Sequence, residues 1–352
     1  MAMKSYKGFD KKLKCRDFQY EIGKEYEMDG EIKVCSRGFH ACESPFDVFD
    51  HYSMIGSRFC EVEQDGNISK EDRGTKICSS KIKIKAELKL ADMINLGVEW
   101  LKEITSPEKI KTSIKDNSSG DNAKIGSSGY NAKIGSSGNG AQIGSSGNGA
   151  KIGSSGYGAQ IGSSGYGAKI GSSGYGAKIG SSGYGAKIGS SGYGAQIGSS
   201  GNDAKIGSSG YGAQIGSSGY GAKIGSSGYG AKIGSSGNDA QIGSSGNGAQ
   251  IGSSGYGAKI GSSGNGAQIG SSGNYAKIDS TGEGCVIMCA GINSVAKASK
   301  GSWITLSEWS YSDKKKRYIP VCVKTEFVDG EKIKADTYYC LKGGVFVESV
   351  ND

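Results

Sequence analysis

The feature that most constrains this chain is a nine-residue repeat that fills its middle. From Asn117 onward the sequence reads Gly-Ser-Ser-Gly, then Tyr or Asn, then Gly-Ala, then Lys or Gln, then Ile. Isoleucine closes 18 successive units, from Ile125 to Ile278. A flexible linker has no physical reason to keep one apolar residue in register through so many units. The repeat therefore predicts a regular solenoid rather than a disordered spacer.

The unit itself predicts how the solenoid is built. Ala and Ile lie two residues apart, so in an extended strand both point inward while the Lys or Gln between them points outward. We expect the Gly-Ser-Ser-Gly run to supply the turn, because glycine tolerates the positive φ of tight corners. One short strand and one turn cover only half a circuit. Two units therefore make an 18-residue flattened coil, and about nine coils stacked at ~4.8 Å give a rod of roughly 43 Å.

Composition excludes several other classes of protein. The 352 residues include 63 Gly but only 3 Pro, and Gly does not recur at every third position, which excludes collagen. A hydrophobic fraction of 35% is low for one large globular core. The chain has no apolar stretch of membrane-spanning length, and the segment Met1 to Tyr6 has no apolar core of a secretory leader. Nine cysteines without a regular framework favour a reducing environment, so we expect a cytoplasmic protein.

The two-unit coil resembles the β-roll made by the calcium-binding nonapeptide repeats of secreted toxins. That family places an Asp in every turn to hold the ion. Here the comparable position is nearly always Gly, with Asp only at Asp203 and Asp239. We therefore expect a calcium-free roll with no cofactor, mainly β in class.

Charge predicts that the two faces of the roll differ. Residues 124–278 contain 11 Lys and two acids, whereas the whole chain has a formal charge of +8, so the net positive charge belongs to the repeat. Taken alternately, one set of units has Lys in eight of nine positions and the other in three of nine. Duplication of a 54-residue block would also produce this pattern. Such a block contains an even number of units, so each unit stays on its own face. The basic face consists of Lys133, Lys151, Lys169, Lys187, Lys205, Lys223, Lys259 and Lys277.

These lysines have two interpretations. Such a face would bind a polyanion, nucleic acid or an acidic protein surface, with release of counterions. Alternatively the lysines only keep the rod soluble and guard it against sheet-to-sheet aggregation.

The fifth position of the unit is Tyr in ten units, including Tyr157, Tyr166 and Tyr175. Stacked tyrosines would form a binding platform for bases or sugars, or they would cover the edge of the small core and stack on one another.

The flanking segments predict two further domains. Residues 1–115 read as an α+β domain, with a strand at Lys81 to Leu88, a helix from Ala91 to Ile104 and a further helix beginning at Ser106-Pro107. The solenoid with its degenerate capping units covers 116–306. Residues 307–352 read as a small β-meander, including Lys332-Ile333-Lys334, whose exposed strand edges would favour homo-oligomers.

The N-terminal domain carries the candidate chemistry. Both histidines, His40 and His51, lie in one stretch together with Arg37. With Tyr6-Lys7-Gly8-Phe9 and Gly38-Phe39-His40-Ala41-Cys42, this stretch resembles an uncharacterised family of phage and prophage proteins that carry Gly-Ser-Ser-Gly solenoids. The resemblance implies a viral or mobile-element origin but no activity.

The same domain is also similar to ADP-ribosyltransferase folds in the order of its elements. Gly38 to His40 would be a strand, Asp47 to Tyr52 a helix and Phe59 to Val62 the next strand, with His40, Arg37 and His51 as catalytic candidates. The catalytic Glu of such enzymes cannot be assigned in this sequence. The other interpretation of His40 is a buried, hydrogen-bonded histidine in a structural domain.

A metal site is the remaining option in this domain. Cys35, His40 and Cys42 with Cys15 or Cys60 would supply ligands, but the chain has no Cys-x-x-Cys pair, and Cys285 and Cys289 do not form a standard one either. We expect no metal. The sequence therefore favours a non-enzymatic binding or scaffold protein, phage-encoded and acting on a host component such as a defence system in the host cytoplasm, with an ADP-ribosyltransferase-like enzyme as the alternative.

Overall fold

The computed structural model describes residues 2–54, 56–71, 75–105 and 120–349. The chain divides into two compact units, Met1–Trp100 and Leu101–Asp352, which are described in turn. The helix expected at Ser106-Pro107 lies outside the described residues. Among the helices that are described, none is long and apolar enough to cross a membrane.

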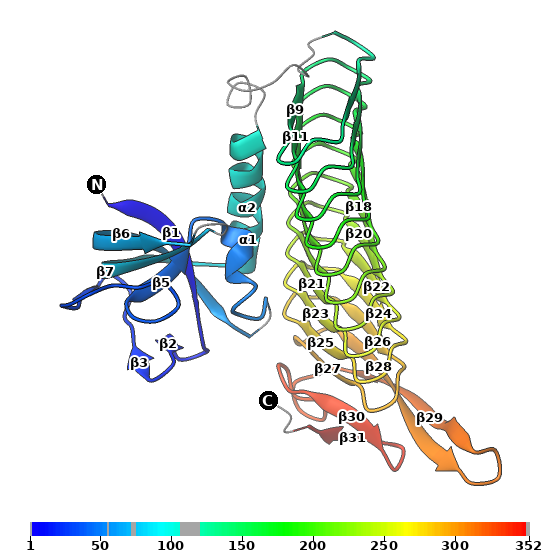
Figure 1. Ribbon diagram of the computed structural model, residues 1–352. Coiled ribbons are helices and arrows are strands. Elements are labelled where there is room, and N and C mark those ends of the chain that lie inside the picture. Colours follow the sequence, from blue (N-terminus) through cyan, green and yellow to red (C-terminus); the bar gives the residue numbers. More distant parts are fainter. Residues whose placement is uncertain (1, 55, 72–74, 106–119, 350–352) are drawn as a thin grey trace. The chain divides into compact units, whose positions relative to one another are not determined.

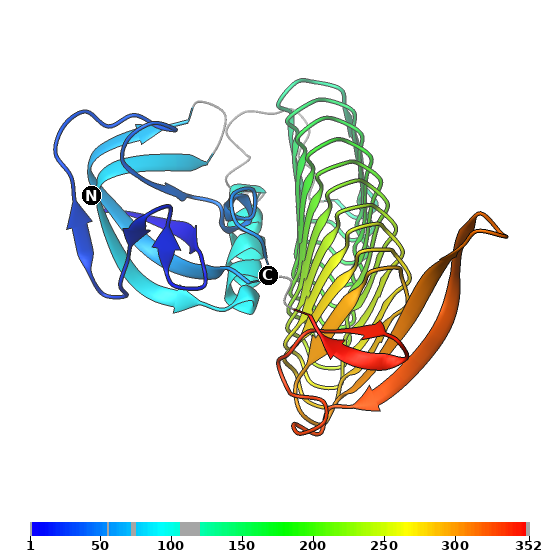
Figure 2. The ribbon, with the colours of Figure 1, turned by 90° about the horizontal axis from the view of Figure 1, so that it is seen from below.

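The first unit is a small antiparallel barrel (Figure 2). Strand β1 pairs with β5 and β6, β5 pairs with β7, and β7 pairs with β6, so four strands close a cycle, and β4 adds to β7. Phe9, Phe39, Val62 and Ile84 pack in its core. The elements are β1 (Met3–Phe9), β2 (Lys14–Cys15), β3 (Phe18–Gln19), β4 (Glu25–Glu27), β5 (Phe39–Cys42), α1 (Pro45–Val48), β6 (Arg58–Lys70), β7 (Lys76–Leu88) and α2 (Leu90–Thr105), whose last turn crosses the unit boundary.

Local sequence accounts for most of these elements. The expected strand at Lys81 to Leu88 lies within β7, and the expected helix from Ala91 to Ile104 coincides with α2. The helix predicted at Asp47 to Tyr52 is wrong in position and length, because α1 spans only Pro45–Val48. Proline fits the first helical position, where its missing N–H is not needed, so the helix begins there.

The second unit is a parallel β-solenoid made of two facing sheets (Figure 1). In the regular units, the residue before each isoleucine is Lys or Gln. We call the sheet in which this residue is mostly Gln the amide sheet, and the sheet in which it is mostly Lys the lysine sheet. The amide sheet contains β8 (Lys124–Ser127), β10 (Gln142–Ser145), β12 (Gln160–Ser163), β14 (Lys178–Ser181), β16 (Gln196–Ser199), β18 (Gln214–Ser217), β20 (Lys232–Ser235), β22 (Gln250–Ser253), β24 (Gln268–Ser271), β26 (Val286–Cys289), β28 (Trp303–Ser312) and β29 (Arg317–Phe327). The lysine sheet contains β9 (Lys133–Ser136), β11 (Lys151–Ser154), β13 (Lys169–Ser172), β15 (Lys187–Ser190), β17 (Lys205–Ser208), β19 (Lys223–Ser226), β21 (Gln241–Ser244), β23 (Lys259–Ser262), β25 (Lys277–Ser280), β27 (Val295–Ala298), β30 (Tyr339–Lys342) and β31 (Val345–Glu348).

Strand register confirms the two-unit coil. Each strand pairs in parallel with the strand two units away, so that Ile161 lies beside Ile143 and Ile170 beside Ile152. The degenerate strands β26 and β27 extend the same two sheets. The solenoid therefore has about ten turns, one more than the nine predicted from the regular units.

The interior differs from the prediction in one respect. Each four-residue strand turns its second and fourth side chains inward, so in β15 both Ile188 and Ser190 are fully buried. The first Gly and Ser of the Gly-Ser-Ser-Gly run therefore belong to the strand, and only its second half forms the turn. The core is a row of Ala, Ile and Ser, because alternation along an extended strand continues past the isoleucine.

The C-terminal segment forms two hairpins rather than the expected single meander. Strand β28 continues the amide sheet and pairs with β29, whereas β30 joins the lysine sheet at β27 and pairs with β31. Lys332 to Lys334 form no strand. A solenoid end exposes two unpaired strand edges, and one hairpin covers each of them.

Candidate functional site

The lysines of the basic face predicted from the sequence lie in one in-register row on the lysine sheet. Consecutive lysines pair from Lys133 to Lys223, Gln241 interrupts the row, and Lys259 and Lys277 resume it. Its members differ in exposure, since Lys259 is exposed, Lys205 is 7% exposed and the others are half-buried. At the end of the row, Lys277 Nζ lies 4.4 Å from the centre of the Tyr338 ring.

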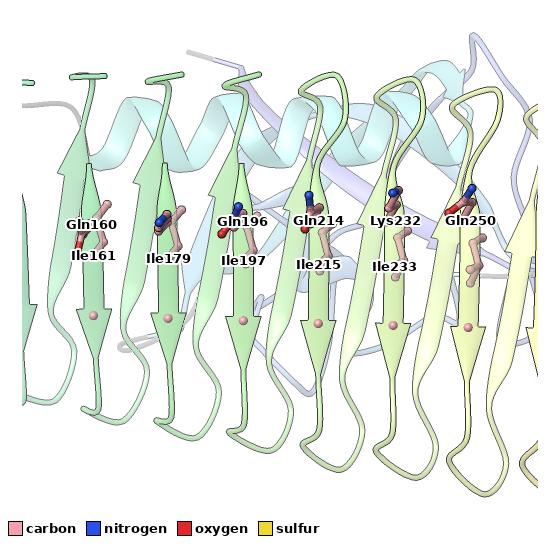
Figure 3. Close-up of a pocket in the computed structure, with 18 of the residues that line it drawn as sticks. Gln160, Ile161, Ile179, Gln196, Ile197, Gln214, Ile215, Lys232, Ile233 and Gln250 are labelled. Atoms are coloured by element: carbon pink, nitrogen blue, oxygen red, sulfur yellow. The ribbon is translucent and has the colours of Figure 1, made fainter. Parts of the chain in front are cut away.

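The amide sheet presents the more open face. A shallow groove of about 1730 Å³ runs along it from β8 to β26. Figure 3 shows Gln160, Gln196, Gln214 and Lys232 in one outward row above the isoleucines of the same strands. In the regular strands β8 to β24 the next outward residue is a glycine, and at Gly198 an added Cβ would meet nothing within 4 Å. The groove is therefore a glycine floor beside a row of exposed amides.

The candidate tyrosines separate onto two edges of the solenoid. Tyr157 and Tyr175 belong to one stack of five rings, in which successive centroids lie 5.0–5.1 Å apart with nearly parallel planes. Tyr166 lies on the other edge and stacks on Tyr184 at 5.2 Å. Each inner ring of the five-ring stack has both of its faces stacked against neighbouring rings. These rings therefore cannot also hold bases between them.

Asp203 and Asp239 replace glycine for a conformational reason. Their φ angles are 54° and 55°, and the glycines at the same position of neighbouring units have φ near 66°. Asp and Asn are the residues other than glycine that tolerate this left-handed region best. The two carboxylates are thus explained by backbone geometry, without a calcium ion.

A second candidate site is a pocket of about 990 Å³ in the barrel unit. Its walls bring together both motifs noted in the sequence, Lys7-Gly8 from β1 and Gly38 to Cys42 at β5, with Cys15 and Tyr52. A side chain at Gly8 would collide with Tyr52, since its Cβ would lie 2.4 Å from the ring. Glycine in the first motif therefore makes room for the tyrosine that closes the pocket.

Lys7 is the buried cation of this pocket. Its side chain is 4% exposed, and Nζ donates hydrogen bonds to the His40 carbonyl oxygen at 2.9 Å and to Cys15 Sγ at 3.5 Å. The rings of Phe9 and Tyr20 lie within 5.6 Å of the same atom. Burial lowers the pKa of Lys7, because desolvation disfavours the ammonium.

Cys15 accepts a second hydrogen bond from the pocket. The Tyr52 hydroxyl donates to Cys15 Sγ at 2.9 Å, so a phenol and an amine both point at the sulfur. Burial raises the pKa of Tyr52, and its hydrogen bond to Cys15 acts in the same direction. Tyr52 therefore stays protonated and remains a donor.

The predicted catalytic candidates are only partly brought together. His40 and His51 line the pocket, and His40 Nε2 accepts the backbone N–H of Cys35 at 3.0 Å. Burial, followed by the charge of Lys7, lowers the pKa of His40, so the ring is neutral at pH 7. Arg37 does not line this pocket. Its guanidinium instead donates to the carbonyl oxygens of Asp29 and Glu31, which fixes the loop before β5.

The cysteine positions do not assemble a metal centre. Within the described ranges, no group of three or more His, Cys, Asp or Glu side chains is placed to hold an ion. All nine cysteines are free thiols. Sequence reasoning missed the pairing of Lys7 with Cys15, because nothing in the local pattern distinguishes a buried lysine from an exposed one.

Residues 3–96 match a family described as a domain of unknown function (DUF7666). The matched range contains the barrel and all residues of the pocket. No curated protein and no solved structure matches the chain.

Proposed function

We propose that this chain is a non-enzymatic binding and scaffold protein whose solenoid docks an extended acidic segment of a partner protein along the amide sheet. The observation that supports this most directly is the open groove from β8 to β26. It is continuous and repetitive, which suits an extended ligand better than a compact one.

The glycine floor favours a polypeptide as the occupant. Positions such as Gly162, Gly180 and Gly198 leave open space where a side chain would stand. Glycine within a strand often marks the close approach of another backbone. The exposed Gln amides beside the floor both donate and accept hydrogen bonds, as a peptide backbone does. An extended chain would therefore find partners for its own N–H and C=O groups.

Charge favours an acidic segment. Three exposed lysines, Lys124, Lys178 and Lys232, recur on every third strand of the amide sheet. The repeat between residues 124 and 278 holds 11 Lys against two acids. Carboxylates laid along the groove would meet these cations and reduce the repulsion within the rod. The lysine row on the opposite sheet is the alternative docking face for a polyanion.

Nucleic acid is a weaker candidate. Proteins that hold single strands without sequence preference stack bases on aromatic side chains. In the five-tyrosine stack the inner ring faces are already covered by neighbouring rings. A strand would be left with backbone contacts alone.

The resemblance of the motifs is the basis for a proposal about the origin and setting of the protein. We propose a phage origin, a partner in the host cytoplasm such as a component of a defence system, and self-association through the C-terminal hairpins. The phage resemblance of Lys7-Gly8-Phe9 and Gly38 to Cys42 supports the first two proposals. The strand edges of the C-terminal hairpins support the third.

Two charge-matched variants of the full chain test the docking face. Fluorescent poly-glutamate would be titrated with the parent, with K178Q/K232Q on the amide sheet and with K133Q/K151Q on the lysine sheet. Exposed ion pairs contribute up to about 1 kcal/mol each, so the first pair should weaken binding roughly tenfold. The second pair should leave binding within about twofold.

A third variant tests the groove itself. Gly198→Val and Gly216→Val together would fill the floor at positions where a Cβ meets nothing within 4 Å, so the fold should survive. Binding should then fall while circular dichroism stays unchanged. Equal weakening by both lysine pairs, or full binding with a filled groove, would exclude the amide sheet as the docking face. Preference for an oligonucleotide over poly-glutamate would exclude an acidic protein segment.

A further inference from the structure

The pocket of the barrel unit contains a nucleophile that docking on the solenoid does not use. Cys15 lines this pocket and is partly exposed there. The thiols of Cys42, Cys60 and Cys78 in the same unit are buried. A partly exposed thiol in a pocket meets the access requirement of a reactive cysteine.

Two further groups act directly on the sulfur. Lys7 Nζ lies 3.5 Å from Sγ and the Tyr52 hydroxyl lies 2.9 Å from it. A nucleophile, a base within reach and a group that orients them form the arrangement used in covalent catalysis. Tyr52 is in turn held in place by packing over Gly8.

We propose that this pocket is a nucleophilic thiol site, in which Cys15 attacks small electrophiles that carry an anionic group. Lys7 takes the proton that the thiol gives up and then stays beside the sulfur as an ammonium. Sγ forms a bond to the electrophilic carbon, the bond from that carbon to its leaving group breaks, and the leaving group departs with the electron pair.

The buried position of Lys7 suits the role of base. Desolvation lowers its pKa, so the neutral amine that accepts a proton is more available than in an exposed lysine. Among the described residues, no carboxylate forms a hydrogen bond with Lys7 Nζ. The hydrogen bonds of this atom go to the His40 carbonyl oxygen and to Cys15 Sγ. After proton transfer the ammonium is therefore balanced by the thiolate.

The charges around the pocket select the class of electrophile. Lys7, Lys76 and Arg16 line the pocket together with His40. After burial, the charges of these three cations lower the pKa of that ring. Asp17 and Asp50 also line the pocket, and Lys7 is balanced by the thiolate, so Arg16 and Lys76 are the cations available to an anionic group. A carboxylate or phosphate on the electrophile would be drawn toward the cations and would lie next to Sγ.

Alkylation of the full-length protein tests the site. Iodoacetate, which carries a carboxylate, and the neutral iodoacetamide would be applied separately, and each cysteine would be followed by peptide mass spectrometry. Both reagents react by the proposed step, with Sγ forming the new bond and iodide leaving. Cys340, which is partly exposed and belongs to the other unit, is the internal reference. We expect Cys15 to react about tenfold faster than Cys340 with iodoacetate, and to show the higher ratio of iodoacetate to iodoacetamide rates.

Three variants assign the effect to the named groups. Tyr52→Phe should slow alkylation of Cys15 several-fold and leave Cys340 unchanged. Arg16→Gln, at an exposed position, should lower only the preference for iodoacetate. Lys7→Met should lower both the rate of Cys15 alkylation and the preference for iodoacetate. Circular dichroism checks that this variant is folded. The proposal is overturned if Cys15 reacts no faster than Cys340, if both cysteines show the same reagent ratio, or if Tyr52→Phe leaves the rate at Cys15 unchanged.

Discussion

Three neighbouring glycines of the repeat serve three different physical needs. Gly192 lies at a corner where its Cα faces the previous coil, and an added Cβ would lie 1.9 Å from the carbonyl oxygen of Gly174. Gly194 has a φ of 65°, which suits glycine rather than a residue with a Cβ. Gly198 is extended and faces open space. Three residues of one type are thus retained by packing, by backbone conformation and by an open surface.

A series of alanine substitutions should separate these needs. Gly192→Ala should cost several kcal/mol, because the backbone of two coils must move apart. Gly194→Ala should cost about 1–2 kcal/mol from the left-handed conformation alone. Gly198→Ala should change stability by less than about 0.5 kcal/mol. Chemical denaturation of the three proteins measures this order, and equal losses at Gly192 and Gly198 would contradict the close approach of the coils.

At the scale of single elements, the five-tyrosine stack is a structural feature of one edge. Tyr193 has ring neighbours at 5.0 Å on both sides, Tyr175 and Tyr211. Tyr220 lies on the other edge. In the coils before and after it, the same position is occupied by Asn202 and Asn238. The two residues therefore have the same place in the repeat but different aromatic surroundings.

This difference predicts different costs of truncation. Aromatic pairs contribute roughly 0.5–1.5 kcal/mol beyond the area they bury. Tyr193→Ala should thus destabilise the solenoid by about 1 kcal/mol more than Tyr220→Ala. Thermal unfolding monitored by circular dichroism gives the comparison. Equal losses would mean that the rings contribute only by covering the core edge.

The elements also show where sequence reasoning succeeds and where it stops. Each strand of the solenoid was predictable, because the spacing of Ala and Ile forces alternation and the period of nine forces two units per coil. The inward serines were not predicted, because a Gly-Ser-Ser-Gly run is typical of a turn. Helix α1 begins before the expected position because Pro45 fits the first turn of a helix.

The pocket could be predicted only as a list of motifs. Lys7, Cys15, His40 and Tyr52 come from separate segments of the barrel, and only strand pairing brings them together. The burial of Lys7 depends on packing across the barrel rather than on the residues beside it. Gly8 offered a signal, since a glycine inside a strand suggests the close approach of another group.

At the scale of the whole molecule, the central claim is that two units form one coil. Both C-terminal hairpins depend on this pairing, because β28 must follow β26 in the amide sheet and β30 must meet β27 in the lysine sheet. An even number of units removed from the middle keeps every later strand in its sheet. An odd number moves every later strand to the opposite sheet.

Deletion of 171–188 against deletion of 180–188 is the most direct test. The first removes two units and should leave a single cooperative thermal transition close to that of the parent, since nearest-neighbour contacts dominate the stability of repeat folds. The second removes one unit, exchanges the lysine and amide rows beyond the cut and forces an altered coil, so its melting temperature should fall well below that of the longer deletion. Equal melting temperatures for the two proteins, or a more stable single-unit deletion, would contradict the two-unit coil.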